Sequence, residues 1–419
     1  MSPEWTLFRD LGDALTRAWR ALDFDEARFP ELATRALTEA QLADHVDPMA
    51  LLSDLLLAEP PVEQRGDNDF GEPPLTVYRG PGFYIEVLYW LDATTTLHGH
   101  GFSGAFQVLA GSSLHTTHTF TEHRRVRSTL RLGTVTRQSV ALLERGEVRP
   151  IHAGDAFIHA LFHLDRPSVS LVVRTTTEAD RLPQFSYLPP SVAYVEDLPD
   201  PLRDRRLRAL AVLPESVLVP TYRRLATESD LGLLFAVARH HAHPLRDPAL
   251  ARQLLDLARP RHGAAIDALV PALDEQVRRF HLTERRALVT EPDLRFVLAL
   301  LMNLDRRDDV LALLARRVPA GIDPVDALIT ALIALAYRPD ATTTGVLDVV
   351  FTHAFGGSER VLAIYGEVVR ALVEHDDPSA LVPRVTWVVG ELEPGEAAGV
   401  EGLYANLLAP TSPLSILAR

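Results

Sequence analysis

Two residue types are missing from this chain of 419 residues, cysteine and lysine. The absence of cysteine excludes disulfides, thiolate metal sites, iron–sulfur clusters and thiol nucleophiles. The absence of lysine excludes Schiff-base catalysis and a phosphate-binding lysine of the Walker type. Any metal that the protein binds must therefore be held by histidine, aspartate or glutamate.

The sequence also lacks long apolar runs and a surplus of basic residues. No apolar stretch reaches the roughly 18 uninterrupted residues of a membrane-spanning helix, and the first ten residues lack the basic and apolar pattern of a secretory signal. The formal net charge of −14 argues against a nucleic-acid-binding protein. Apolar residues make up 47% of the chain and charged residues 23%, as in globular proteins. We therefore expect a cytoplasmic globular protein that binds neither a membrane nor a nucleic acid.

The hydrophobic pattern predicts an α+β multidomain chain. In residues 1–73, apolar residues recur three to four positions apart, which predicts an N-terminal group of helices. Residues 74–180 form short alternating runs rich in β-branched and aromatic residues, which predicts an antiparallel β-barrel or sandwich of seven or eight strands. Five prolines mark residues 181–202 as a connector. Residues 203–419 contain about a dozen helical segments without a regular repeat, so we expect an all-helical bundle or irregular solenoid.

Eight of the sixteen histidines fall between residues 98 and 163. His98 and His100 are separated by one residue within a predicted strand, so both side chains point to the same face. Their Cα atoms should lie roughly 6–7 Å apart, which lets two imidazoles reach one metal ion. A third ligand must come from elsewhere in the barrel, and His159 lies in the next-to-last predicted strand. Three neutral imidazoles would leave positions on the metal open for substrate or dioxygen, as a catalytic site requires.

The spacing around this histidine pair resembles the first motif of the cupin barrel. That motif is HxH, three or four residues, a glutamate, six residues and a glycine. The chain keeps the spacing from His98 to Gly111 but has Gly104 where cupins have a glutamate ligand. The resemblance implies a jelly-roll barrel that holds a metal ion through its histidines.

A second stretch resembles the second cupin motif, in which a proline and a glycine precede the third metal histidine. Here Gly154 precedes His159, while His152 replaces the proline and His163 replaces an asparagine. The interval before His159 is two residues longer than in the usual motif. A missing glutamate ligand and a stretched second motif are similar to the cysteine dioxygenase branch of the cupins, whose iron(II) is bound by three histidines. This resemblance covers about residues 1–190.

The resemblance implies roles for individual residues. The positions that match the metal ligands are His98, His100 and His159. The implied metal is iron(II), with another divalent transition metal as the alternative.

Five further side chains are candidates around the metal. Arg79 lies near the place of the arginine that binds the substrate carboxylate in this branch, and Ser170 matches the first residue of its Ser-His-Tyr relay. Arg174 occupies the place of the relay tyrosine and could face an anionic substrate group, because guanidinium pairs well with carboxylate or phosphate. His163 or His152 would act as hydrogen-bond partners within the site.

Other residues of this region have plainer interpretations. We expect His115 and His118 on an outer or rim strand. Gln107 is a conceivable oxygen ligand, but strand alternation turns it away from the face that carries His98. Residues 101–150 contain seven arginines and three acidic residues, which indicates a solvated hairpin or a docking face for an acidic partner or for the chain's own helices.

Three functions follow from this interpretation. The first is a mononuclear non-haem iron(II) dioxygenase whose substrates are dioxygen and a small or carrier-tethered anion (a thiol, enolate or carboxylate). The second is a ligand-binding or assembly protein, in which the barrel binds a small molecule and the helical domain docks a protein partner. The third is a metal-dependent isomerase or lyase that uses the same site without dioxygen.

Overall fold

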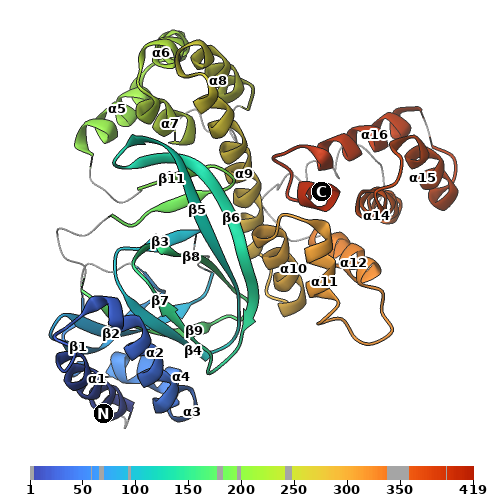
Figure 1. Cartoon of the computed structure of the whole chain (residues 1–419). Coiled ribbons are helices and arrows are strands. Elements are labelled where there is room, and N and C mark those ends of the chain that lie inside the picture. Colours follow the sequence, from blue (N-terminus) through green and yellow to red (C-terminus); the bar gives the residue numbers. More distant parts are fainter. Residues whose placement is uncertain are drawn as a thin grey trace. The chain divides into compact units, whose positions relative to one another are not determined.

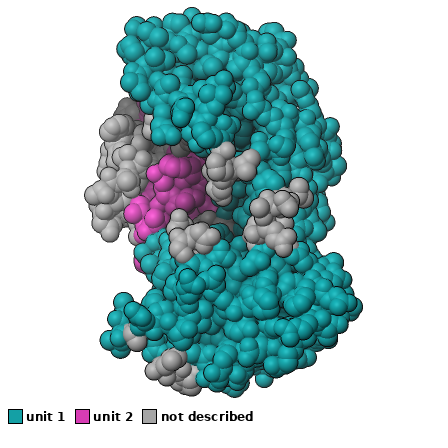
Figure 2. Space-filling view, turned by 90° about the vertical axis from the view of Figure 1, so that its left-hand side faces the viewer, with its two compact units in different colours: residues 1–241, 254–269 teal, residues 242–253, 270–419 magenta. Residues whose placement is uncertain are grey.

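The computed structural model describes residues 4–57, 59–65, 70–92, 96–176, 183–195, 200–240, 248–336, 358–392 and 394–419. The chain forms two compact units, coloured in Figure 2. Unit 1 comprises residues 1–241 and 254–269, and unit 2 comprises residues 242–253 and 270–419.

Unit 1 begins with the helices that the apolar periodicity predicted (Figure 1). They are α1 (Glu4–Arg20), the short 3-10 helix η1 (Glu26–Arg28), α2 (Phe29–Ala40), α3 (Leu42–His45) and α4 (Pro48–Leu57). Phe8, Trp19 and Phe29 on these helices share one hydrophobic core with Phe83 and Ile85 of the sheet that follows. The helices therefore cover one face of that sheet and fix its position.

The sheet beneath the helices has five antiparallel strands in the order β1-β2-β9-β4-β7. The strands are β1 (Pro74–Gly80), β2 (Phe83–Trp90), β4 (Gly104–Ala110), β7 (Val148–Ile151) and β9 (Ser168–Thr175). Side chains alternate between its two faces, as strand geometry requires. Trp90, Phe106 and Val172 form a second core on the face turned away from the helices.

Six strands form a closed barrel in the order β10-β11-β6-β5-β8-β3. Their bounds are β3 (His98–His100), β5 (Ser113–Arg127), β6 (Leu130–Leu143), β8 (Gly154–His163), β10 (Ser186–Leu188) and β11 (Val192–Tyr194). β5 and β6 make one long hairpin. β10 and β11 lie within the segment 181–202 that was predicted to be a connector, and β10 closes the barrel by pairing with β3.

The rest of the described chain is helical, as predicted. In unit 1, the barrel is followed by α5 (Pro201–Val212), α6 (Glu215–Glu228) and α7 (Leu231–His240). Two helices contribute to both units, α8 (Pro248–His262) and α9 (Ala264–Ala287). Unit 2 continues with α10 (Pro292–Asn303), α11 (Arg307–Leu314), α12 (Pro324–Ala336), α14 (Ser358–Glu374), η2 (Pro378–Ala380), α15 (Leu381–Val389), α16 (Pro394–Leu408) and η3 (Ser415–Ala418). Among the described residues, no helix combines the length and the apolar character that crossing a membrane demands.

The expected fold class, an α+β multidomain chain with N-terminal helices, an antiparallel β-barrel and a helical C-terminal region, is confirmed.

Candidate metal centre

Three histidines from two neighbouring strands meet inside the barrel. His98 and His100 lie on β3 and His159 lies on β8, and all three side chains are buried. The pairing of β3 with β8 places His98 directly opposite His159. One ring nitrogen of each residue lies within 4.8 Å of those of the other two. The structure thus brings together the three residues that the sequence analysis predicted as ligands, and their binding of a metal stays a prediction.

The backbone fixes the tautomer of His98. Its Nδ1 lies 2.6 Å from the carbonyl oxygen of Thr96, which can only accept a hydrogen bond, so Nδ1 carries the proton. The lone pair of the neutral ring is therefore on Nε2. Within the described part of the chain this buried Nε2 has no hydrogen-bond partner. A buried acceptor without a donor is costly, and a metal ion would satisfy it.

The spacing of the other two histidines fits a shared ion. Nε2 of His100 and Nε2 of His159 are 2.9 Å apart. Two nitrogen ligands at about 2.1 Å from one ion, at a right angle, would be about 3.0 Å apart. Two nitrogens bound to the same ion can be at most about 4.2 Å apart. The three ring nitrogens here lie within 4.8 Å of one another, so a small ring rotation would bring all three within reach of one ion. The donor set of three imidazoles suits zinc, copper, iron or nickel.

Burial keeps these ligands in the form that binds metal. It lowers the pKa of His98, an effect that the hydrogen bond to Thr96 partly offsets. It lowers the pKa of His100 well below the ordinary value, with further contributions from the charges of His98 and Arg174. The pKa of His159 is also well below its ordinary value, first through burial and then through the neighbouring histidines. At neutral pH all three imidazoles are therefore uncharged and free to donate a lone pair.

Two glycines allow the strands around the site to approach closely. A Cβ on Gly99, between the two β3 histidines, would lie 2.8 Å from the carbonyl oxygen of Gly154. A Cβ on Gly104 would lie 2.0 Å from the carbonyl oxygen of Val173 and 3.0 Å from Cα of Arg174. The pairing of β4 with β9 thus leaves no room for a side chain at position 104. A glutamate at this position, as the cupin motif has, would therefore not fit between these strands.

His115 is a residue of the site that the sequence analysis missed. The expectation that it lies on an outer or rim strand is wrong, because it is buried on the barrel strand β5 and its Nε2 lies 3.0 Å from Nδ1 of His159. Burial lowers the pKa of His115 to about 4. The same strand carries His118, which is partly exposed and whose charge contributes to the lowered pKa of His159. His115 can be identified as part of the site only from the strand register. Thr117 pairs with His159, and His115 lies two residues before Thr117 on β5, so its side chain is on the same face.

Arg174 lies beside the histidines. It stands opposite Gly104 in the β4–β9 ladder, and its guanidinium stacks 3.8 Å from the ring centre of Phe102. The Phe102 ring in turn is 4.6 Å from the ring of His100. The arginine therefore contributes positive charge next to the candidate ligand set, as its effect on the pKa of His100 also indicates.

The remaining predicted residues have contacts away from the three histidines. His163 is buried farther along β8, where its ring stacks on Trp90 and its Nδ1 contacts the hydroxyls of Ser113 and Ser168. Ser170 accepts a hydrogen bond from the indole nitrogen of Trp90. These contacts give His163 a place in the barrel core, and a role in the reaction stays a prediction.

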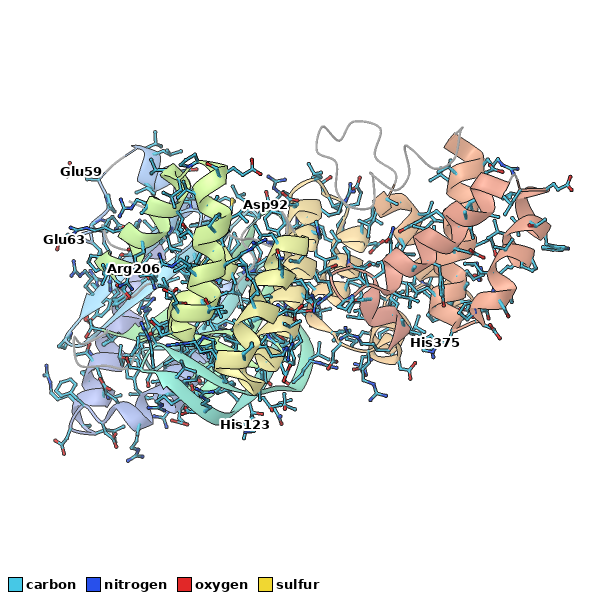
Figure 3. All side chains as sticks on the ribbon, turned by 90° about the horizontal axis from the view of Figure 1, so that it is seen from above. Glu59, Glu63, Asp92, His123, Arg206 and His375 are labelled. Atoms are coloured by element: carbon cyan, nitrogen blue, oxygen red, sulfur yellow. The ribbon has the colours of Figure 1, made fainter. Side chains whose placement is uncertain are left out.

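Arg79 and His152 both face acidic partners near the surface of unit 1. The guanidinium of Arg79 is half-exposed and donates to Glu63 at 2.9 Å. Glu63 lies at the outer edge of the unit (Figure 3). The ring of His152, which is also partly exposed, lies 4.0 Å from Glu31 on α2. Neither contact joins these residues to the candidate ligand set. Gln107, as expected, turns away from it and donates to the carbonyl oxygen of Gly146.

A cavity of about 440 Å³ reaches the site, with His100 and Gly99 in its wall. Arg131 also lines the cavity, where it makes two hydrogen bonds to Asp155, of 2.6 and 2.9 Å, and its guanidinium stacks 3.8 Å from the Phe185 ring. The hydroxyl of Tyr187 donates to Asp155 at 2.5 Å. Phe185 and Tyr187 come from the segment that the sequence analysis treated as a connector. This cavity is large enough to hold a small molecule beside His100.

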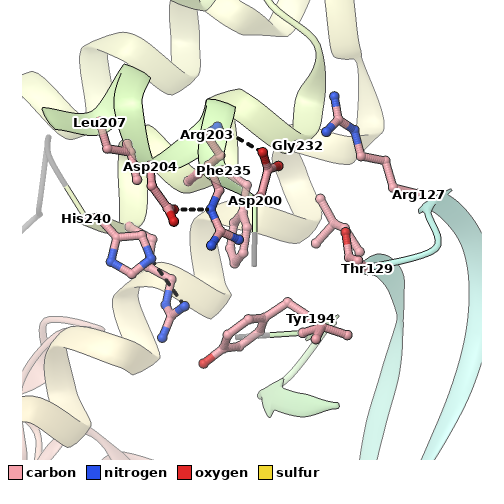
Figure 4. A pocket seen from close by; sticks show the side chains of 14 residues that line it. Arg127, Thr129, Tyr194, Asp200, Arg203, Asp204, Leu207, Gly232, Phe235 and His240 are labelled. Atoms are coloured by element: carbon pink, nitrogen blue, oxygen red, sulfur yellow. Dashed lines mark hydrogen bonds and ion pairs between the residues drawn. The ribbon is translucent and has the colours of Figure 1, made fainter. Parts of the chain in front are cut away.

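A second cavity of unit 1, of about 330 Å³, lies between the end of the β5–β6 hairpin, β11 and helices α5 and α7 (Figure 4). Two of the arginines that line it form ion pairs, one with a carboxylate outside the lining and one with a carboxylate within it. Arg127 forms an ion pair with Asp230 at 2.6 Å, and Arg203 bonds to Asp204 at 3.1 Å. The first of these pairs shows that the arginine-rich hairpin contacts the chain's own helices, which is one of the alternatives left open by its charge.

The chain matches no protein-family model and no curated protein sequence. Among solved structures, a crystal structure of DMSP lyases is similar over 42% of this chain and 94% of that chain, with 17% identity and a TM-score of 0.24. A recombinant oxalate oxidase in complex with glycolate is similar over 41% of this chain and 82% of that chain, with 15% identity and a TM-score of 0.21. TM-scores of this size assign no activity to the chain. The antiparallel barrel of this chain and its buried histidines agree with the cupin fold.

Proposed function

We propose that the protein is a mononuclear non-haem iron(II) dioxygenase that acts on a small or carrier-tethered anion. The observation that carries the proposal is the convergence of His98, His100 and His159 on one buried point, with His100 also in the wall of a cavity. A structural metal site is usually closed by four protein ligands, whereas three leave room for substrate. Iron(II) held in this way supplies dioxygen activation and a Lewis acid for an anionic substrate.

The side chains of this chain hold and orient the ligands. The carbonyl of Thr96 fixes the His98 ring so that Nε2 faces the site. Phe102 and Phe157 contact the His100 ring on β3, with ring centres 4.6 and 6.0 Å away. These apolar neighbours limit the access of water and lower the local dielectric constant, which strengthens electrostatic interactions within the site.

The charge distribution supports an anionic substrate. Three neutral imidazoles leave the charge of a divalent ion uncompensated, and Arg174 adds a positive charge beside His100. In the cavity wall, by contrast, Arg131 is neutralised by its bidentate pair with Asp155. A thiolate, enolate or carboxylate in the cavity would therefore be drawn towards His100 and the metal held beside it. The length of the helical region supports a carrier-tethered substrate or a protein partner as an extension of this proposal.

Oxygen consumption tests the proposal. The iron-loaded full-length protein is mixed with small thiols, enolisable acids and hydroxy acids in an oxygen electrode, and we expect at least one class to cause dioxygen uptake. His100→Ala should abolish the uptake, while Gln107→Leu, at a buried residue that faces away from the histidines, should preserve it. Turnover without dioxygen uptake would support an isomerase or lyase instead. Ligand binding that His100→Ala leaves unchanged would support a binding protein.

A further inference from the structure

The ring of His159 is held at both of its nitrogens by other histidines. Its Nε2 faces His100, and its Nδ1 lies 3.0 Å from Nε2 of His115. His115 itself is packed between aromatic rings, with ring centres 5.9 Å from Phe106 and 6.1 Å from Phe157. This packing restricts rotation of the His115 ring, so its Nε2 stays directed at His159.

We propose that His115 is a positioning residue that fixes the tautomer and orientation of His159 for metal binding. The inference rests on the metal site of the proposed function. If His159 binds through Nε2, its single ring proton is on Nδ1 and needs an acceptor. Nε2 of His115 is the acceptor that the structure places there, and its own proton is then on Nδ1.

The strand register accounts for this contact. Thr117 on β5 pairs with His159 on β8, and His115 lies two residues before Thr117 on the same face. Diagonal neighbours on adjacent antiparallel strands are close enough for two imidazole rings to meet. The arrangement is therefore built into the β5–β8 ladder and does not depend on a loop.

The site thus uses two different acceptors behind its ligands. His98 donates to the backbone carbonyl of Thr96, whereas His159 donates to a neutral imidazole. A carboxylate in that place would raise the basicity of the ligand and add a negative charge next to the ion. The imidazole fixes the ring without adding charge, which preserves the positive character of the site.

The test measures metal affinity and does not depend on turnover. The metal-free full-length chain is titrated with cobalt(II) and with zinc in competition with a chelator of known affinity. Loss of a partner behind a metal-binding histidine typically weakens affinity by roughly 10–100-fold, or about 1.4–2.7 kcal/mol. We expect this loss for His115→Phe, which keeps an aromatic ring but removes the acceptor. The visible spectrum of the cobalt(II) form should also change, because His159 is no longer held in place.

Two further variants separate positioning from packing. His115→Gln offers a side-chain oxygen near the place of Nε2 and should restore affinity to within about threefold of the natural chain, since the hydrogen bond is regained. Thr116→Val, at the next residue of β5 and on the opposite face, should leave affinity unchanged. Equal affinity in His115→Phe and in the natural chain would overturn the role of His115, and so would a His115→Gln variant as weak as His115→Phe.

Measurement on the unmodified protein covers the case in which His115→Phe does not fold. In nitrogen-15 spectra of the zinc-loaded chain with labelled histidine, the ring proton of His159 should be found on Nδ1. A proton on neither nitrogen, or on Nε2, would overturn the inference. A natural chain that binds neither cobalt(II) nor zinc would instead defeat the proposed function itself.

Discussion

Gly104 is the position where the sequence departs most clearly from the cupin motif, and the structure makes a quantitative prediction for it. In Gly104→Ala, the new Cβ would lie 2.0 Å from the carbonyl oxygen of Val173. This is about 1.5 Å inside an ordinary van der Waals contact of roughly 3.5 Å. The clash is with backbone, so no side-chain rotation relieves it, and β4 and β9 must move apart.

Separation of these strands strains the centre of the five-stranded sheet. Overpacking of a core costs about 1–3 kcal/mol, and weakened ladder hydrogen bonds add about 1 kcal/mol each. We therefore expect Gly104→Ala to lower the free energy of unfolding of unit 1 by at least about 3 kcal/mol. With a urea m-value near 3 kcal/mol/M, the unfolding midpoint should fall by about 1 M. Gly104→Glu should suffer at least as much and add no metal ligand.

Tryptophan fluorescence in a urea titration measures this change. Trp5, Trp19 and Trp90 are buried in unit 1, whereas Trp387 of unit 2 is almost fully exposed, so the signal reports mainly on unit 1. Gly402→Ala in α16 of unit 2, where a Cβ meets no atom of the described residues within 4 Å, is the control for adding a methyl group elsewhere in the chain and should leave the signal from unit 1 unchanged. A midpoint for Gly104→Ala equal to that of the natural chain would refute the reasoning.

Two other predictions concern charged groups. Burial alone would raise the pKa of Glu275, but ion pairs with Arg278 and Arg279 outweigh burial and lower it to about 2. The group therefore stabilises unit 2 fully above its ordinary pKa of 4.5, by up to roughly 3 kcal/mol, and this contribution is lost as the pH falls towards 2. Glu275→Gln should flatten the fall in unfolding free energy between pH 5 and 2, measured by urea titration at each pH with circular dichroism as the readout, because the helices of unit 2 contribute to that signal. Arg131→Met should remove the bidentate partner of Asp155 in the cavity wall, costing about 1–3 kcal/mol in the same assay because a partly buried carboxylate loses its charge-assisted hydrogen bonds.

Each of these has a clear contrary result. An acid titration of Glu275→Gln that parallels the natural chain would show that the carboxylate contributes nothing through its lowered pKa. For Arg131→Met, an unchanged midpoint would show that solvent replaces the guanidinium without loss. Arg79→Met is its matched control, since the Arg79 ion pair with Glu63 is exposed and such pairs contribute little.

The periodicity of the sequence was sufficient to predict the classes of structure. Alternation in residues such as Phe83–Trp90 predicted a strand, and the HxH spacing predicted that His98 and His100 share a face. The match of His159 to the second motif predicted which strand supplies the third histidine. These features depend on local geometry, and local geometry is encoded within a few residues.

Features that depend on strand register could not be predicted in this way. His115 and His159 are 44 positions apart, and only the β5–β8 pairing brings their rings together. β10 and β11 have three residues each and are bordered by prolines, so their alternation is too short to distinguish a strand from a connector. His163 shares the parity of His159 along β8, but four residues of extended strand cover roughly 13 Å, which separates it from the site.

The metal content of the purified protein tests the central claim most directly. The full-length chain is expressed in iron-replete medium and analysed for transition metals by mass spectrometry, beside His98→Ala, His100→Ala and His159→Ala. We predict about one equivalent of metal per natural chain and its loss from each of the three variants, with folding checked by circular dichroism. A folded natural chain without stoichiometric metal, or variants that retain as much metal as the natural chain, would contradict the account.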